Sequence, residues 1–147
     1  MKPYHLAIAG GGIAGTTLAL ALSGLGLRIA LIDPRPALLA SPSGGRRTLA
    51  LSATSCQIFQ ALGVWDQLRQ YASAIQQIHV SEVGRAGMTR LRAAECSRPA
   101  FGYTLDSDRL EQVLAERLAE RAEIESLQAR VTGFTQSPQN QVSLQLS

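Results

Sequence analysis

Three glycines near the N-terminus, in the pattern Gly10-x-Gly12-x-x-Gly15, constrain the fold of this chain more than any other sequence feature. An apolar run, Tyr4 to Ala9, leads into them and predicts a buried strand. An Ala- and Leu-rich segment follows them and predicts a helix from Gly15 to Leu25. These features predict a tight turn that joins a strand to a helix.

A second apolar run, Leu27 to Ile32, predicts another strand, and Asp33 stands at its end. Strand, glycine turn, helix and strand within about 30 residues form a βαβ unit, which belongs in a parallel sheet. The sequence therefore predicts an α/β protein with a Rossmann-like start.

The spacing of the glycines suits the binding of a dinucleotide pyrophosphate. Gly10 is expected to make the tight turn, Gly12 to let the backbone approach the phosphates, and Gly15 to let the helix pack against the strand. Asp33 is placed to accept hydrogen bonds from a ribose diol. An acid here disfavours NADP, while both NAD and FAD stay open at this point.

A lone GxGxxG motif also occurs in purely structural turns, and the apolar stretch Ile13 to Ile32 could be read as a targeting segment. Arg28 interrupts that stretch, and Ala19, Leu22 and Gly26 extend the glycine motif at the spacing expected for a helix against a sheet. Dinucleotide binding is therefore the favoured interpretation.

Composition excludes several other functions. The chain has 147 residues, of which 46% are hydrophobic, as expected for one globular domain. Its 14 Lys and Arg against 11 Asp and Glu are mostly scattered arginines, so we expect no nucleic-acid partner. Cys56 and Cys96 lie far apart, without a CxxC motif or a nearby histidine. We therefore expect no metal site, and thiols kept reduced in the cytoplasm.

The remaining chain departs from a plain series of βα units. Residues 34–45 and the segment Arg46 to Ser52 are predicted as loop, and residues 75–83 and 88–91 as a β-hairpin. Helices are predicted at Ser52 to Leu62, ended by Gly63, and at Asp108 to Arg121. Short strands are predicted at residues 124–127, 130–135 and 142–146.

Four further segments carry a family resemblance. They are Arg47–Ser52, Leu62–Trp65, Ile78–Glu82 and Gly102–Asp106. Together with the glycine motif, they resemble the ubiquinone-biosynthesis hydroxylases, within the para-hydroxybenzoate hydroxylase group of FAD monooxygenases. The resemblance extends over essentially the whole chain.

The resemblance implies FAD as the cofactor, NAD(P)H as co-substrate, and hydroxylation by O₂ of a small phenolic substrate with a prenyl tail. Such a substrate implies peripheral association with the inner face of the membrane, or with a quinone-synthesis complex. The candidate cofactor-binding residues are Gly10, Gly12, Ile13, Ala14, Gly15, Asp33, Pro34, Arg35, Arg47, Ser107 and Val131.

Three of these candidates come from the later part of the chain. Arg47 matches a family arginine beside the cofactor, and a guanidinium suits phosphate or ribose oxygens. Ser107 matches a polar position that is longer in relatives, and it is equally explained as a helix N-cap. Val131 corresponds to the region where such proteins pack the adenine through backbone atoms.

Two later motifs of the family, an Asp-Gly pair and a Gly-Asp pair, do not occur in this sequence. We therefore expect residues 1–147 to form the N-terminal part of an incomplete FAD-binding domain, with the βαβ unit at 1–33, an inserted β-hairpin or meander from about 75 to 103, and no second complete domain. Catalytic residues are not identified. Another FAD enzyme of the same fold and a non-catalytic dinucleotide-binding module are the alternatives.

Overall fold

The computed structural model describes residues 3–35, 47–84, 86–139 and 141–147. The chain divides into two compact units. The first unit comprises Met1–Gly44 and Glu111–Ser147, and the second comprises Gly45–Leu110. The predicted loop at residues 36–45 lies outside the described residues, as does Arg46.

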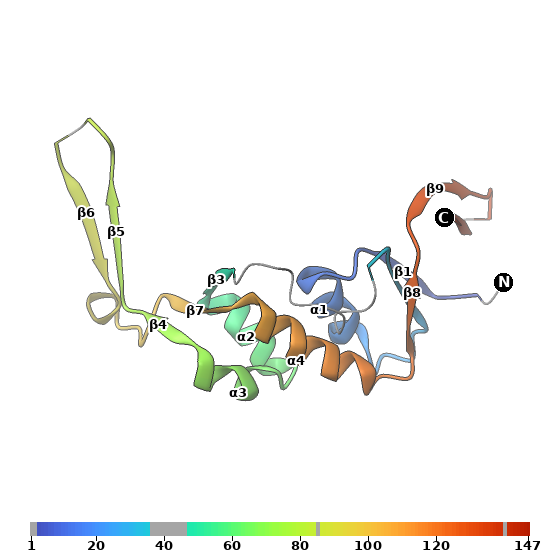
Figure 1. Cartoon of the computed structure of the whole chain (residues 1–147), viewed down its shortest axis with the longest axis horizontal. Coiled ribbons are helices and arrows are strands. Elements are labelled where there is room, and N and C mark those ends of the chain that lie inside the picture. The colour runs from blue at the N-terminus through green and yellow to red at the C-terminus, as the bar shows by residue number, and fades with distance from the viewer. Residues whose placement is uncertain (1–2, 36–46, 85, 140) are drawn as a thin grey trace. The chain divides into compact units, whose positions relative to one another are not determined.

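A parallel sheet forms the centre of the first unit (Figure 1). Its strands are β1 (Leu6–Ala9), β2 (Ile29–Asp33) and β8 (Ile124–Gln128), in the order β1-β2-β8. The first four residues of β2 are apolar and at most 4% exposed, as is usual for a parallel strand covered on both faces, and Asp33 follows them at the end of the strand. The helix α1 (Ile13–Leu22) connects β1 to β2, which confirms the predicted βαβ unit.

The helix α1 begins and ends earlier than the sequence predicted. It starts at Ile13 rather than Gly15, and Ser23 ends it by donating its N–H and hydroxyl to the carbonyl of Leu20. Gly24 and Gly26 then take positive φ angles of 81° and 73° before β2 begins. The predicted helix end at Leu25 was therefore too late, because the chain already leaves the helix at Ser23.

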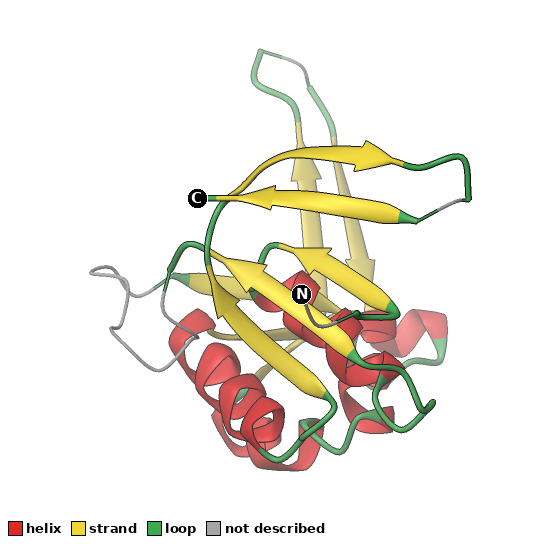
Figure 2. Cartoon of the chain, turned by 90° about the vertical axis from the view of Figure 1, so that its right-hand side faces the viewer, coloured by secondary structure: helices red, strands yellow, loops and turns green. Residues whose placement is uncertain are grey.

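The C-terminal part of the first unit is an antiparallel pair, β9 (Val131–Gln136) and β10 (Val142–Leu146). Figure 2 shows the two strands as a ribbon that ends at the C-terminus. The helix α4 (Ser107–Ala119) contributes residues to both units. Its predicted apolar face is confirmed, since Leu110, Val113, Leu114 and Leu118 are all buried.

The second unit contains an antiparallel sheet in the order β3-β7-β4, made of β3 (Thr48–Ser52), β7 (Gly102–Asp106) and β4 (Ser73–Ile75). The loop prediction for Arg46 to Ser52 was wrong over β3. This segment gains its hydrogen bonds from β7, far along the chain, so short-range patterns do not reveal it. Gly102 permits the pairing, because a Cβ there would lie 2.0 Å from the Leu51 carbonyl oxygen.

This unit also contains the helices α2 (Ala53–Ala61) and α3 (Trp65–Leu68) and the short 3₁₀ helices η1 (Arg69–Tyr71) and η2 (Ala93–Cys96). Ser52 caps α2 by accepting a 3.1 Å hydrogen bond from the Ser55 N–H. The core includes Phe59, Val64, Trp65 and Leu68.

The predicted hairpin is present as β5 (Gln77–Ser81) paired antiparallel with β6 (Met88–Arg92), the two-stranded ribbon of Figure 1. The predicted strand 75–83 is divided, however, because the chain changes partners at Gln76. Ile75 closes β4, which pairs with β7, whereas β5 pairs with β6.

Among the described residues, no helix is long and apolar enough to cross a membrane.

Candidate dinucleotide-binding site

The turn after β1 depends on the backbone of Gly10. Its φ angle is +113°, a region that residues with a Cβ rarely adopt. Its N–H donates a 2.7 Å hydrogen bond to the carbonyl of Ile32, which fixes the turn to the end of β2. Gly10 therefore makes the tight turn that its place in the motif predicted.

The other two motif glycines differ in what surrounds them. A Cβ on Gly15 would lie 1.8 Å from the carbonyl oxygen of Gly10, so the protein's own backbone requires glycine there. Among the described residues, a Cβ on Gly12 would meet the Arg35 Nη2 atom alone, at 3.8 Å. The described part of the chain therefore leaves space beside Gly12, and a bound ligand could use it.

The N-terminus of α1 presents backbone N–H groups at this turn. Gly12 is its N-cap, and no side chain among the described residues caps it. The first helical bond runs from the Thr16 N–H to the Gly12 carbonyl, at 2.9 Å. The N–H groups of Ile13, Ala14 and Gly15 precede that bond, so helix geometry gives them no internal acceptor. Such donors, at the positive end of the helix dipole, suit an anion such as a phosphate.

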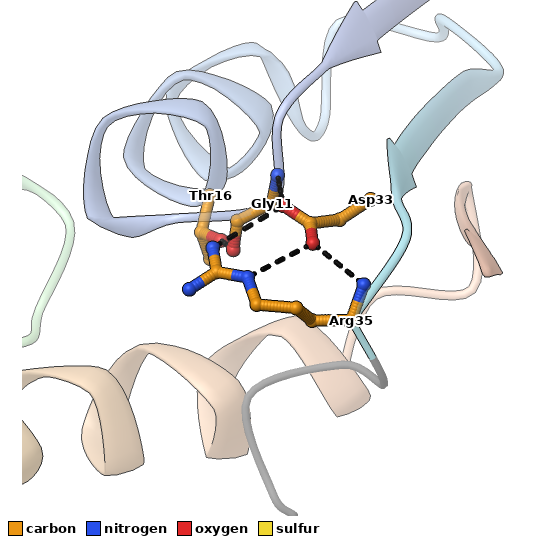
Figure 3. A network of polar contacts seen from close by, with 4 residues as sticks. All are labelled: Gly11, Thr16, Asp33 and Arg35. Carbon is orange, nitrogen blue, oxygen red and sulfur yellow. Dashed lines mark hydrogen bonds and ion pairs between the residues drawn. The ribbon is translucent and has the colours of Figure 1, made fainter. Parts of the chain in front are cut away.

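Asp33 ends β2 and turns its carboxylate back onto the glycine turn (Figure 3). Its Oδ2 atom accepts a 2.7 Å hydrogen bond from the Gly11 N–H. The structure thus brings the glycine turn and the predicted acid together. Gly11 and Asp33, which this bond joins, are 22 residues apart in the sequence.

Arg35 holds the same carboxylate from the other side. Its backbone N–H and Nε donate to Asp33 Oδ1 at 2.9 and 3.1 Å, and its Nη2 donates to Oδ2 at 3.3 Å. The hydrogen bond from the Arg35 side chain is the main reason why the pKa of Asp33 falls to about 2, against the opposing effect of burial. The backbone N–H groups of Arg35 and Gly11 lower this pKa further. Asp33 is therefore an anion at neutral pH, and Pro34 lies exposed between the two partners.

Two residues of this network were not among the sequence candidates: Gly11 and Thr16 (Figure 3). A Cβ on Gly11 would lie 2.9 Å from the Cβ of Asp33, so the approach of Asp33 requires a glycine. Thr16 is fully buried, and its hydroxyl donates a 3.1 Å hydrogen bond to the Gly11 carbonyl. The signals available in the sequence were the middle glycine of the run Gly10-Gly11-Gly12 and a polar residue in an apolar helix.

Val131 lies where the chain continues beyond β8. Residue 128 at the end of β8 pairs with Asp33, and the Ala129 N–H donates to the Asp33 carbonyl at 3.2 Å. Val131 opens β9 two residues later and pairs with Leu146. This segment therefore reaches the end of β2 that carries the acid.

Arg47 and Ser107 belong to the second unit, where the Ser107 N–H donates a 2.8 Å hydrogen bond to the Arg47 carbonyl. Ser107 is buried and is the first residue of α4, and its hydroxyl lies 3.4 Å from Asp108 Oδ1. Neither the cap nor the cofactor contact proposed for Ser107 follows from these bonds. The neighbouring Asp106 has a buried Oδ1 atom without a hydrogen-bond partner in the described chain.

The described residues contain no cluster of three or more His, Cys, Asp or Glu that could hold a metal ion.

Comparison with known proteins identifies the family of this chain. A family model described as FAD binding domain matches residues 4–145. The 3-demethoxyubiquinol 3-hydroxylase of Escherichia coli is 31% identical over 80% of this chain and 30% of its own length. The ubiquinone hydroxylase UbiL of Rhodospirillum rubrum is 34% identical over 80% of this chain and 27% of its own length.

Solved structures share the fold at lower identity. AlpK has a TM-score of 0.77 and 21% identity, over 99% of this chain and 28% of its own. The p-nitrophenol 4-monooxygenase PnpA of Pseudomonas putida has a TM-score of 0.74 and 19% identity, over 97% of this chain and 36% of its own.

This chain thus spans less than a third of the two curated relatives described above. The family match extends over nearly all of the chain, including the glycine turn, Asp33 and both units. The chain therefore belongs to the FAD binding domain family.

Proposed function

We propose that this chain holds the ADP half of FAD in a flavin monooxygenase that hydroxylates a prenylated phenol in ubiquinone biosynthesis, with NAD(P)H and O₂ as co-substrates. The observation that carries the proposal is the open space beside Gly12, at an uncapped helix N-terminus, next to an ionised Asp33. Two of the relatives, the 3-demethoxyubiquinol 3-hydroxylase and the ubiquinone hydroxylase UbiL, support the substrate class.

The residues of the turn fit the pyrophosphate of FAD. The N–H groups of Ile13, Ala14 and Gly15 supply donors, and the glycine at position 12 leaves room for phosphate oxygens. In the described first turn of α1, no acidic side chain would repel the phosphates. These residues would bind and orient the nucleotide without taking part in the reaction.

Asp33 could bind the adenosine ribose if the Arg35 side chain releases the Asp33 carboxylate. An ionised carboxylate has about four lone-pair sites, and Gly11 and Arg35 occupy them in this structure. The Arg35 side chain is 71% exposed, so solvent can take over its contacts at small cost. Its withdrawal would free two acceptor positions for the 2′- and 3′-hydroxyls, while the Gly11 N–H keeps the carboxylate in place.

FAD would supply the chemistry, because a flavin can accept hydride and, once reduced, activate O₂. The part played by this chain is to bind and position the nucleotide. A prenyl tail on the substrate would also favour binding of the complete protein at a membrane surface. Cosedimentation with lipid vesicles, with and without the prenylated phenol, tests that second point.

The test of the proposed reaction uses the complete protein and isotopically labelled O₂. With FAD, NADH or NADPH, and a polyprenylated methoxyphenol, we expect one labelled oxygen atom in the phenolic product. A phenol of the same ring pattern without the prenyl tail is the matched control. Flavin binding without labelled product from either phenol would reject the hydroxylase and favour another FAD enzyme of this fold. Absence of flavin binding would reject the cofactor assignment itself.

A further inference from the structure

We infer that Thr16 is a positioning residue that aims the Gly12 N–H at the pyrophosphate of the bound nucleotide. This inference rests on the proposed function of the turn, and it concerns a residue outside the glycine motif. The Thr16 hydroxyl donates to the Gly11 carbonyl at 3.1 Å (Figure 3). The Thr16 N–H donates to the Gly12 carbonyl at 2.9 Å. One fully buried residue therefore holds two successive carbonyls of the turn.

The direction of the Gly12 N–H follows from the peptide plane. In a trans peptide, the carbonyl of one residue and the N–H of the next point in opposite directions. The described peptides contain no cis bond. Because the Gly11 carbonyl points to the buried Thr16 hydroxyl, the Gly12 N–H must point away from it, out of the core.

The preceding peptide is fixed as well. The Gly11 N–H donates to Asp33 Oδ2 at 2.7 Å, so side chains hold both the N–H and the carbonyl of Gly11. Three consecutive glycines would otherwise have wide conformational freedom. Holding them in one arrangement before the ligand arrives lowers the entropic cost of binding.

The adjacent Thr17 shows that this bond is not the usual one for a helical threonine. The Thr17 hydroxyl donates to the Ile13 carbonyl, four residues earlier and within the helix, at 2.6 Å. The Thr16 hydroxyl instead reaches the Gly11 carbonyl, five residues earlier and outside the helix. The two threonines therefore provide a matched pair, in which only one hydroxyl acts on the turn.

The experiment measures dissociation constants of ADP, adenosine and FAD for the complete protein and its variants. Thr16→Val removes the hydroxyl and keeps the shape of the side chain. We expect it to weaken ADP and FAD about tenfold, the change produced by weakening one hydrogen bond to a charged phosphate. Adenosine, which lacks phosphates, should bind as in the wild type. Thr16→Ser should restore ADP binding, and Thr17→Val should leave it unchanged.

Three outcomes would overturn the inference. One is wild-type ADP affinity in Thr16→Val; another is an equal loss of adenosine and ADP binding, which would mean a general structural effect. The third is an equal loss in Thr17→Val. Should Thr16→Val not fold, Thr16→Ala against Thr16→Ser gives the same comparison. If the wild-type protein binds neither ADP nor FAD, the proposed function is refuted. If the wild-type protein binds both but does not hydroxylate the phenol, the same affinity measurements still decide the role of Thr16.

Discussion

At the scale of single residues, the motif glycines are needed for different reasons. Gly15 is required by the protein, because a Cβ would collide with the Gly10 carbonyl oxygen. Gly12 has no such neighbour among the described residues, and its φ of −72° is open to any residue. Gly15 therefore meets a folding requirement, whereas we propose a binding requirement for Gly12, and mutations can separate the two.

Gly15→Ala should destabilise the fold. The added methyl group would lie 1.8 Å from a backbone oxygen, so α1 and the turn must move apart. We expect the free energy of unfolding to fall by about 2–4 kcal/mol, as for severe overpacking. Urea unfolding checks this, with Gly12→Ala as the control, which should cost about 1 kcal/mol or less. Equal stability losses in the two variants would contradict the assignment.

The pKa of Asp33 should depend on Arg35. Because the Arg35 side chain is the main cause of the low value, Arg35→Gln should raise the pKa of Asp33 from about 2 toward its ordinary 3.8. In the wild type, the stability due to this shift is present above pH 3.8 and is lost as pH falls toward 2. Carboxylate NMR titration measures the pKa directly. An unchanged pKa in Arg35→Gln, or equal shifts in Arg35→Gln and Arg35→Lys, would refute this role.

Sequence reasoning located the residues whose role follows from spacing, namely the three motif glycines and Asp33. It missed Gly11 and Thr16, because their contacts depend on which way each peptide of the turn faces. That orientation is set by Asp33 and Thr16 acting from outside the turn. The periodicity of the sequence does not predict the orientation of these peptides.

At the scale of elements, local patterns predicted the βαβ unit, the hairpin and the apolar face of α4. They failed where strands depend on distant partners. The segment Thr48–Ser52 is a strand because β7 pairs with it. Residues 73–81 form two strands because the first part pairs with β7 and the second part pairs with β6. Helix ends were displaced by local capping, as at Ser23.

Gly102→Ala should disrupt the sheet of the second unit. Its Cβ would lie 2.0 Å from the Leu51 carbonyl oxygen, at the point where β3 and β7 pair through Ser52 and Gly102. We expect a loss of about 2–4 kcal/mol in the free energy of unfolding. Hydrogen exchange should show faster exchange in β3 and β7.

Gly133→Ala is the matched control in a strand. Its Cβ would meet the Oε1 atom of Gln145 at 2.9 Å, and that flexible side chain can move away. Its cost should therefore stay below about 1 kcal/mol. If Gly133→Ala destabilised the protein as much as Gly102→Ala, the close backbone approach at β3 would not be the cause.

At the scale of the whole molecule, the fold class was predictable but the division into units was not. The first unit is discontinuous, since the chain leaves it after residue 44 and returns at residue 111 to place β8 beside β2. The predicted single incomplete domain, with an insertion at about 75–103, remains a prediction. A boundary set by pairing between distant segments leaves no signal in composition.

The FAD dissociation constant of the complete protein with Gly12→Val tests directly whether the space beside Gly12 holds the pyrophosphate. A Cβ at this position meets no backbone atom of the described residues within 4 Å, and a valine side chain would occupy the space assigned to the pyrophosphate. We predict at least about a tenfold weaker FAD affinity, with the free energy of unfolding changed by about 1 kcal/mol or less. Wild-type FAD affinity in Gly12→Val would contradict the account.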